Sequence, residues 1–334
     1  MLDLTLKKSL DAICIGRAGM DLYANETNTN FAEVTQFNKH VGGSPANIAV
    51  GMAKLGAQVG FIGKVSDDVV GHYVKGYLEE QGINTAGVSI DDSGTRTSLA
   101  LTEMRPDNCA VVIYRNNAAD LALCTDDINA DFVASARMLV VSGTALSANP
   151  SRQAAYKAIE IAHANNTKVV LDLDYRAYTW RSLQEASEVY QHAAEFSNML
   201  IGNNEEFEVM GVQAGSEVGD TAKACLRGST QAVLIKGGAQ GSFVYTSSGD
   251  HFTQGSFAVD VVKPFGAGDA YAAGICAGVA AGLPLSEAVQ RGSAAAAIVV
   301  AGYACSSASP NTAELTHFLQ NNEAAKLAQQ PIRR

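Results

Sequence analysis

Lys-Pro-Phe-Gly-Ala-Gly-Asp-Ala-Tyr, residues 263–271, is the stretch that says most about the fold. Gly266 and Gly268 precede Asp269, and a run of small apolar residues that favours a buried helix follows. The free N–H groups and positive dipole at a helix start suit a phosphate. A carboxylate that faces the phosphate is repelled by it, which is unfavourable unless the carboxylate takes a proton from an attacking hydroxyl. The stretch predicts phosphoryl transfer, although an ordinary turn with an Asp helix cap has the same pattern.

The composition sets limits on the class of protein. The chain has 334 residues, of which 47% are hydrophobic and 17% charged, enough to bury a large core. Its net charge is −10, and no block of Lys or Arg is present, which argues against a nucleic-acid partner. An anionic substrate therefore needs a local positive pocket.

The cysteines and the apolar segments bear on location. The six cysteines form neither a C-x-x-C pair nor a cluster with His, so we expect small buried side chains in a reducing compartment. The N-terminus lacks the pattern of a signal peptide. Residues 294–304 are too short to cross a bilayer and predict a buried helix. We expect a soluble, cytoplasmic protein without a membrane partner.

Apolar strand patterns alternate with helical patterns along most of the chain. This alternation is typical of βαβ units and a mainly parallel sheet. The predicted strands are 12–16, 59–65, 138–143, 168–173, 199–201 and 232–236, and the predicted helices include 47–55, 69–81, 150–164 and 183–195.

Two segments, about 21–41 and 95–115, have a different pattern. Polar and apolar residues alternate in them, as in half-exposed antiparallel strands. Ligands of open α/β sheets bind at the carboxyl ends of the strands. We therefore expect the two segments to pair as a small lid over that end of the sheet.

A second glycine cluster follows the first lid segment. Gly42 and Gly43 open a predicted helix, and Asn47 lies on its first turn. One interpretation is close approach of the backbone to a polyol whose hydroxyls bond to Asn47. The other is a tight turn before a helix.

Three further polar clusters follow predicted strands. Asn203 and Glu206 are spaced to share a helix face, where they would orient magnesium-bound water or form a capping box. Lys236, Gly238 and Gly241 suit either a nucleotide site or a hairpin turn.

The third of these clusters covers residues 171–176. It places acidic groups and Arg176 at the end of a buried strand, where charged groups are costly unless they form ion pairs or take part in the function. A structural salt bridge would explain them as well as a functional role. Four of the five clusters fall at predicted strand ends on the same edge of one sheet, which favours a nucleotide-dependent kinase over unrelated turns.

These motifs, in this order and spacing, resemble the ribokinase-like (PfkB) carbohydrate kinases over about residues 11–310. The resemblance implies one α/β kinase domain, residues 1–334, built as a three-layer sandwich. This domain would contain a mainly parallel central sheet of about nine strands and a small β-sheet lid. It also implies ATP, Mg²⁺ and transfer of the γ-phosphoryl group to a primary hydroxyl.

The resemblance carries roles onto individual residues. Asp269 would be the general base, and the N–H groups of Gly266, Ala267, Gly268 and Asp269 the anion hole. Asn203 and Glu206 would serve magnesium, mainly through water. The expected nucleotide contacts are Lys236, Gly238, Gly241, Gly266 and Gly268, and the expected sugar contacts are Asp21, Gly42, Gly43 and Asn47.

One departure from the family concerns the residues before the anion hole. Lys263, Pro264 and Phe265 stand where the family has Asp-Thr-Thr. The family's usual monovalent-cation site lies near that Asp, so use of a monovalent cation stays open here. We expect Lys263 to place a fixed positive charge near the phosphates.

Residues 16–24, 114–120, 171–180 and 263–269 are similar to those of 5-dehydro-2-deoxygluconokinases of myo-inositol catabolism. That resemblance implies 5-dehydro-2-deoxy-D-gluconate as substrate and its 6-phosphate as product. A sugar-acid carboxylate is best held by the guanidinium fork of Arg. Arg17 and Arg115 are the candidates for this contact, whereas Arg176 suits either the carboxylate or a phosphate, and a surface salt bridge is the alternative for each.

Three rival functions remain. A 2-dehydro-3-deoxygluconate kinase would need Arg in the same way, because its substrate is also a sugar acid. A fructokinase or ribokinase would have less need of Arg, because its substrate is a neutral sugar. A catalytically silent sugar-binding regulator would not need Asp269. The residues after the first strand do not form a dinucleotide fingerprint, which disfavours a dehydrogenase. Alternating apolar residues of the lid such as Leu99 and Leu101, or Val111 and Ile113, predict a homodimer through the lid.

Overall fold

The computed structural model describes residues 2–106, 109–211 and 218–325. Within these ranges, nine strands form one sheet in the order β13-β12-β11-β10-β9-β8-β1-β4-β5. β11 and β12, and β12 and β13, pair antiparallel, and all other neighbours are parallel. The strands are β1 Leu10–Ile15, β4 Val59–Ser66, β5 Asn84–Asp91, β8 Ala136–Ser142, β9 Lys168–Asp172, β10 Met199–Asn203, β11 Ala232–Lys236, β12 Ser242–Thr246 and β13 His251–Gln254.

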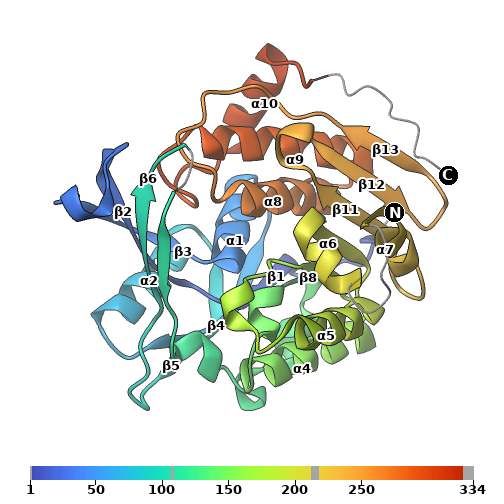
Figure 1. Cartoon of the computed structure of the whole chain (residues 1–334). Coiled ribbons are helices and arrows are strands. Elements are labelled where there is room, and N and C mark those ends of the chain that lie inside the picture. Colours follow the sequence, from blue (N-terminus) through green and yellow to red (C-terminus); the bar gives the residue numbers. More distant parts are fainter. Residues whose placement is uncertain (1, 107–108, 212–217, 326–334) are drawn as a thin grey trace.

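Helices cover both faces of this sheet (Figure 1). The helices of one face are α1 Ser44–Lys54, α2 Val69–Glu80, α8 Ala267–Ala280 and α9 Leu285–Val300, with α10 Thr312–Asn321 packed outside α9. Those of the other face are α3 Ala130–Ala134, α4 Ser151–Ala164, α5 Leu183–Glu195, α6 Asn204–Gly211 and α7 Val218–Cys225. The predicted three-layer α/β sandwich is confirmed.

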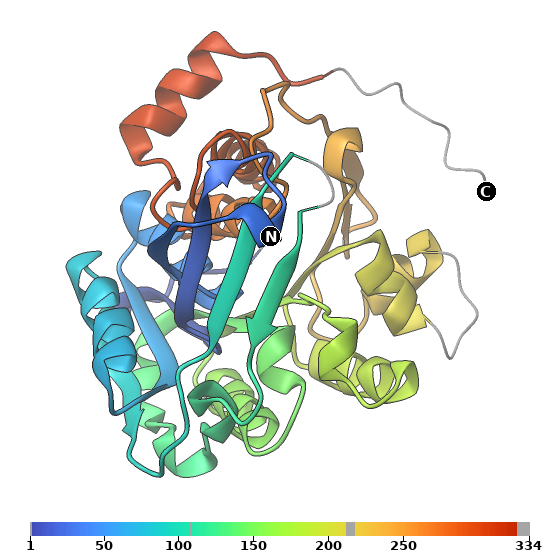
Figure 2. The ribbon, with the colours of Figure 1, turned by 60° about the vertical axis from the view of Figure 1, so that its left-hand side comes forward.

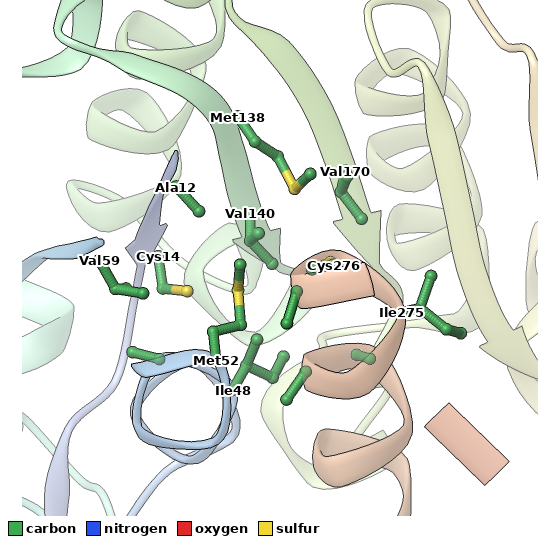
Figure 3. Packing of buried hydrophobic residues seen from close by; sticks show 14 of the residues in the cluster. Ala12, Cys14, Ile48, Met52, Val59, Met138, Val140, Val170, Ile275 and Cys276 are labelled. Carbon is green, nitrogen blue, oxygen red and sulfur yellow. The ribbon is translucent and has the colours of Figure 1, made fainter. Parts of the chain in front are cut away.

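The alternation of side chains along each strand creates two cores. Ala12 and Cys14 of β1 face α1 and α8, whereas Ile13 and Ile15 face the opposite helices. Figure 3 shows the first core, where α1 and α8 lie side by side against β1, β8 and β9. Because α1 and α8 share this layer, their N-terminal ends can contribute to one site.

A second sheet of four strands forms the lid, in the order β3-β2-β6-β7. Its strands are β2 Gly19–Thr27, β3 Phe37–Gly42, β6 Leu99–Met104 and β7 Val111–Tyr114. The lid stands apart from the main sheet, and its strands lie side by side in Figure 2. The lid was predicted at 21–41 and 95–115, of which residues 107–108 lie outside the described part of the chain.

The pairing inside the lid corrects one expectation. Each segment forms antiparallel contacts, β2 with β3 and β6 with β7, but the seam between them, β2 with β6, is parallel. The register also separates the apolar residues, because Leu99 and Leu101 pair with Tyr114 and Val112, whereas Ile113 and Val111 pair with Ala100 and Thr102. Leu99 and Leu101 therefore lie on the opposite face of the lid from Val111 and Ile113.

The predicted helix at 294–304 is displaced in the structure. α9 begins at Leu285 and ends at Val300, so residues 301–304 are not helical. β5, which was not predicted, adds an edge strand beside β4. Among the described residues, no helix is long and apolar enough to cross a bilayer.

Candidate active site

The N-terminus of α8 is the centre of the candidate site. Gly266 precedes the helix with a φ of 84°, a conformation that glycine adopts without strain. A Cβ on Gly266 would lie 2.6 Å from Sγ of Cys305, which also requires glycine. The first N–H groups of a helix have no acceptor within it, so those from Gly266 to Asp269 are available to an anion.

Asp269 lies on the first turn of α8 and is held by α1. Nδ2 of Asn47 donates to Oδ2 of Asp269 over 2.7 Å. Burial raises the pKa of Asp269, and the charge of Asp174 raises it further, whereas hydrogen bonds from Asn47 and Ser44 lower it. A half-buried carboxylate with a raised pKa suits proton abstraction near neutral pH.

Two buried oxygens nearby have no hydrogen-bond partner in the described residues. They are Oδ1 of Asn47 and Oδ1 of Asp21, whose other oxygen accepts from the hydroxyl of Tyr23 over 3.1 Å. Burial also raises the pKa of Asp21, with Arg17 opposing. A buried acceptor without a partner is costly, so the two oxygens suit the hydroxyl donors of a bound polyol.

The glycine pair permits the lid to approach α1. A Cβ on Gly42 would overlap the Asp21 carboxylate, and one on Gly43 would overlap the carbonyl oxygen of Arg17. The sequence predicted close approach of this backbone to a sugar. The structure shows a close approach to Asp21 and Arg17, so the pair positions these sugar-binding candidates, and contact of the pair with a sugar stays a prediction.

The three arginines have different surroundings. Nη1 of Arg17 donates to Oγ of Ser98 over 3.1 Å, and the side chain is partly exposed. Arg115 is buried, with Nε and Nη2 on Oδ2 of Asp120 and Nη2 also on the carbonyl oxygen of Thr144. These bonds commit Nε and Nη2 of Arg115 and leave Nη1 for a ligand.

Arg176 pairs with the acidic cluster predicted at residues 171–176. Its Nη2 lies 2.7 Å from Oδ1 of Asp174, and about half of its side chain is exposed. The salt bridge that was the alternative explanation for this arginine is therefore present. The arginine still lies close enough to Asp269 to lower the pKa of that carboxyl.

Lys236 contacts acidic residues from two of the predicted polar clusters. Its Nζ lies 3.1 Å from Oδ1 of Asp172 and 3.6 Å from Oε2 of Glu206. A Cβ on Gly268 would come within 3.2 Å of the same ammonium, so Lys236 borders the start of α8. Burial raises the pKa of Asp172 to about 7 against the pull of Lys236, whereas the surrounding carboxylates keep Lys236 charged by raising its pKa.

Asn203 and Glu206 form a reciprocal capping box at the start of α6. The Asn203 N–H donates to Oε2 of Glu206 over 2.7 Å, and the Glu206 N–H donates to Oδ1 of Asn203 over 2.9 Å. The described residues hold no group of three or more acidic, His or Cys side chains arranged to bind a metal. Mg²⁺ would thus fit here if phosphates and water supplied most of its ligands.

Gly238 and Gly241 lie in the hairpin between β11 and β12. The turn contains a short 3₁₀ helix, Gly238–Gln240, and Gly241 has a φ of 83°. A Cβ on Gly241 would overlap the carbonyl oxygen of Gln254. The hairpin explains both glycines, and their contact with a nucleotide stays a prediction.

Sequence reasoning missed the contacts that join the lid to the segment after α9. The hydroxyl of Tyr23 lies 3.2 Å from Sγ of Cys305, across 282 positions of sequence. Ser44 was also missed, although it donates to Asp172. No sequence pattern marks such pairs, whereas the acids at 172 and 174 were found in the sequence because they lie at the end of a buried apolar strand.

Comparison with known proteins agrees with this geometry. The pattern of the pfkB family carbohydrate kinases matches residues 9–312. The chain belongs to the pfkB family of carbohydrate kinases. A relative from Photobacterium profundum, named 5-dehydro-2-deoxygluconokinase, is 51% identical over 95% of this chain and 96% of its own length.

A second pfkB relative of the same name, from Geobacillus thermodenitrificans, is 44% identical over 96% of both chains. The structure of a ribokinase II from E. coli with ATP and Mg²⁺ superposes with a TM-score of 0.85 and 21% identity, covering 93% of this chain and 99% of that one. This likeness confirms the ribokinase-like fold.

Proposed function

We propose that this pfkB kinase transfers the γ-phosphoryl group of ATP to the terminal hydroxyl of 5-dehydro-2-deoxy-D-gluconate and releases the 6-phosphate. The observation that carries the proposal is the Asp269 carboxylate, which has a raised pKa, is bonded to Asn47 and lies at the positive end of α8. The name shared by the two relatives supports the choice of sugar acid.

In this mechanism some side chains bind the sugar and others act on the phosphoryl group of ATP. The unpartnered oxygens of Asn47 and Asp21 accept hydrogen bonds from hydroxyl groups of the sugar, which directs the terminal hydroxyl to Asp269. Asp269 takes the proton as the phosphoryl group moves in line, and the N–H groups of residues 266–269 stabilise the charge that develops. Lys236 adds a positive charge beside Gly268.

The divalent ion and the nucleotide complete the proposed complex. Mg²⁺, held by ATP phosphates and by water oriented by Asn203 and Glu206, would neutralise phosphate charge. Gly238 and Gly241 would let the β11–β12 hairpin run close to the nucleotide. The E. coli neighbour binds ATP and Mg²⁺, in agreement with this assignment.

The substrate carboxylate requires a positive group near the lid. Arg17 is the first candidate, because its guanidinium donates to Ser98 and stays partly exposed. Arg115 would add Nη1, while its other nitrogens keep the chain at residues 115–120 in place. Arg176, already paired with Asp174, suits a phosphate better.

The same proposal includes a cytoplasmic homodimer that forms through the lid. The cysteines of the described residues are free, which fits a reducing compartment. A hollow of about 400 Å³, lined in part by Met20, Leu99 and Tyr114, opens on the lid face away from Asp21. An apolar, hollowed face on a sheet with open edges is suited to a second copy.

The test is an ADP-release assay with ATP and Mg²⁺. It compares 5-dehydro-2-deoxygluconate, 2-dehydro-3-deoxygluconate, fructose and ribose in parallel. We expect kcat/KM to be highest for the first. A preference for the second sugar acid would keep the mechanism and change the substrate, and no turnover of any of the four would contradict the proposed function.

A further inference from the structure

Lys263 is completely buried in the loop before α8. Its exposed fraction is 0%, and it is among the largest fully buried side chains of the protein. Lysine is rarely buried without a partner for its charge. The position is also the one at which this chain departs from the family pattern, so the contacts of the ammonium need an explanation.

The ammonium is bound by main-chain oxygens. Nζ of Lys263 donates to the carbonyl oxygen of Phe265 over 2.9 Å and to that of Val299 over 3.2 Å. It lies 3.8 Å from Sγ of Cys305 and 4.7 Å from the centre of the Phe265 ring, as in a cation–π contact. Among the described residues, no carboxylate oxygen lies within salt-bridge distance of it.

Carbonyl oxygens around a buried positive charge form the kind of environment that holds a dehydrated potassium ion. Here the charge is covalently attached to the chain. The residues at this place do not fit the family's diffusible monovalent cation, because Lys263 replaces the acidic residue and its ammonium already takes the carbonyl oxygens of Phe265 and Val299.

The Phe265 bond acts directly on the predicted anion hole. The carbonyl group of Phe265 and the N–H group of Gly266 belong to the same peptide unit. A cation on that oxygen polarises the unit and makes the N–H a stronger donor. The bond to Val299 ties this peptide to the last turn of α9, where a positive charge also complements the helix dipole.

We propose that the Lys263 ammonium is a built-in cation that replaces a diffusible monovalent ion and fixes the peptide 265–266 for phosphoryl transfer. Lys263 is thus a positioning residue that acts through Gly266. The inference rests on the proposed kinase function and deepens it.

The first test compares salts on the unmodified enzyme. Turnover is measured at equal ionic strength in potassium chloride, sodium chloride and choline chloride. We expect kcat to agree within about twofold in all three, because the cation is part of the chain. A loss of about tenfold or more in choline chloride, restored by potassium, would overturn the proposal.

The second test uses two variants that differ in the space they leave. Lys263→Met fills the site without charge, so kcat should fall by about tenfold to a hundredfold, toward the loss from removing one oxyanion donor, and potassium should not restore it. Lys263→Ala vacates the site, so potassium or ammonium ions should restore at least part of the lost kcat. A Lys263→Met enzyme with unchanged kcat would contradict the inference.

Thermal unfolding gives a readout that does not depend on turnover. Potassium should raise the Tm of Lys263→Ala relative to choline and leave the Tm of the unmodified protein and of Lys263→Met unchanged. If Lys263→Ala responds in neither Tm nor kcat, the site does not hold a cation and the inference fails. If the unmodified enzyme phosphorylates no sugar, the proposed function fails and the Tm comparison still decides the inference.

Lys54 is a matched control. Its Nζ also bonds two main-chain carbonyl oxygens, those of Ser307 at 2.7 Å and Ser309 at 3.1 Å, but at the end of α1 rather than beside Gly266. Lys54→Met should lower the Tm and leave kcat and its salt response unchanged. If Lys54→Met lowered kcat as much as Lys263→Met, a merely structural role would explain both lysines. If Lys263→Ala does not fold, Lys263→Met and the salt comparison decide.

Discussion

At the scale of the residue, Asp269 has the surroundings that a general base requires. We expect Asp269→Asn to lower kcat by about 10²- to 10⁴-fold, because an amide cannot accept the hydroxyl proton. The affinity for ATP should change by less than about threefold, since the N–H groups of the α8 start remain in place. Turnover and ATP titration calorimetry measure the two effects.

The control for this variant is an acid at the opposite ends of the strands, away from the candidate site. Asp11 lies in β1 near the amino ends of the strands, where it accepts from the N–H of Gln58 and pairs with Arg137. Asp11→Asn should affect stability and leave kcat unchanged. Turnover of Asp269→Asn at the level of Asp11→Asn would remove the base assignment.

Asn47 sets the working pH of that base. Its hydrogen bond lowers the pKa of Asp269, so Asn47→Ala should raise that pKa. Because the base acts when deprotonated, kcat/KM falls as pH falls through this pKa. The acid limb of the kcat/KM profile should therefore move to higher pH, and KM for the sugar should rise about tenfold through loss of a bond to a hydroxyl.

Asn129 provides the comparison for this profile. It caps α3 by accepting from the N–H of Phe132. Asn129→Ala should cost about 1 kcal/mol of stability and leave the pH profile in place. An acid limb that stays at the same pH in Asn47→Ala would show that Asp269 does not determine it.

Individual residues also show where sequence reasoning ends. Asp269 and Asn47 could be predicted because each belongs to a local motif at the start of a helix. The partners of Lys263 and Arg115 could not, because Val299 and Thr144 lie 36 and 29 positions away and contribute main-chain oxygens. A carbonyl group carries no side-chain signature, so no pattern in the sequence announces it as a partner.

At the scale of the element, the start of α8 depends on one glycine. Gly266→Ala should cost about 1–2 kcal/mol through its left-handed backbone, and overlap with the Cys305 sulfur adds to this. Adding Cys305→Ala should remove the steric overlap and recover that part of the lost stability, but it should leave the backbone strain. The free energy of unfolding in urea and kcat report the two effects.

Gly82 separates strain from function. Its φ is 76°, and a Cβ there would meet nothing within 4 Å. Gly82→Ala should cost about 1 kcal/mol with kcat unchanged, whereas Gly266→Ala should lose kcat as well. Equal activity in the two variants would show that the α8 start needs no fixed geometry.

The elements themselves were predicted unevenly. α5 and β11 have the predicted bounds because strong periodicity and clear end signals agree there. The end of α9 was placed too late, since the apolar run continues past Val300 although the helix does not. The parallel seam between β2 and β6 could not be predicted, because alternation gives the faces of a strand but not the direction of its neighbour.

At the scale of the whole molecule, the fold brings together parts that are distant in sequence. α1 and α8 meet in one layer, and the lid carries Asp21 to them. The network from Asp21 through Tyr23 and Cys305 reaches Lys263 beside the start of α8. The lid residues that would bind the sugar are therefore connected, through direct contacts, to the loop that would bind the phosphoryl group.

We expect two copies of the chain to assemble through the outer face of the lid. Val112, 49% exposed, lies on the edge strand β7 beside Leu101, so a charge there opposes burial against a second copy. Sedimentation equilibrium should give about twice the chain mass of 34.9 kDa, and Val112→Glu should halve it. Leu183→Glu, at a 50% exposed position at the start of α5, should stay dimeric. A monomeric unmodified protein, or dimers in both variants, would show that the lid does not pair two copies.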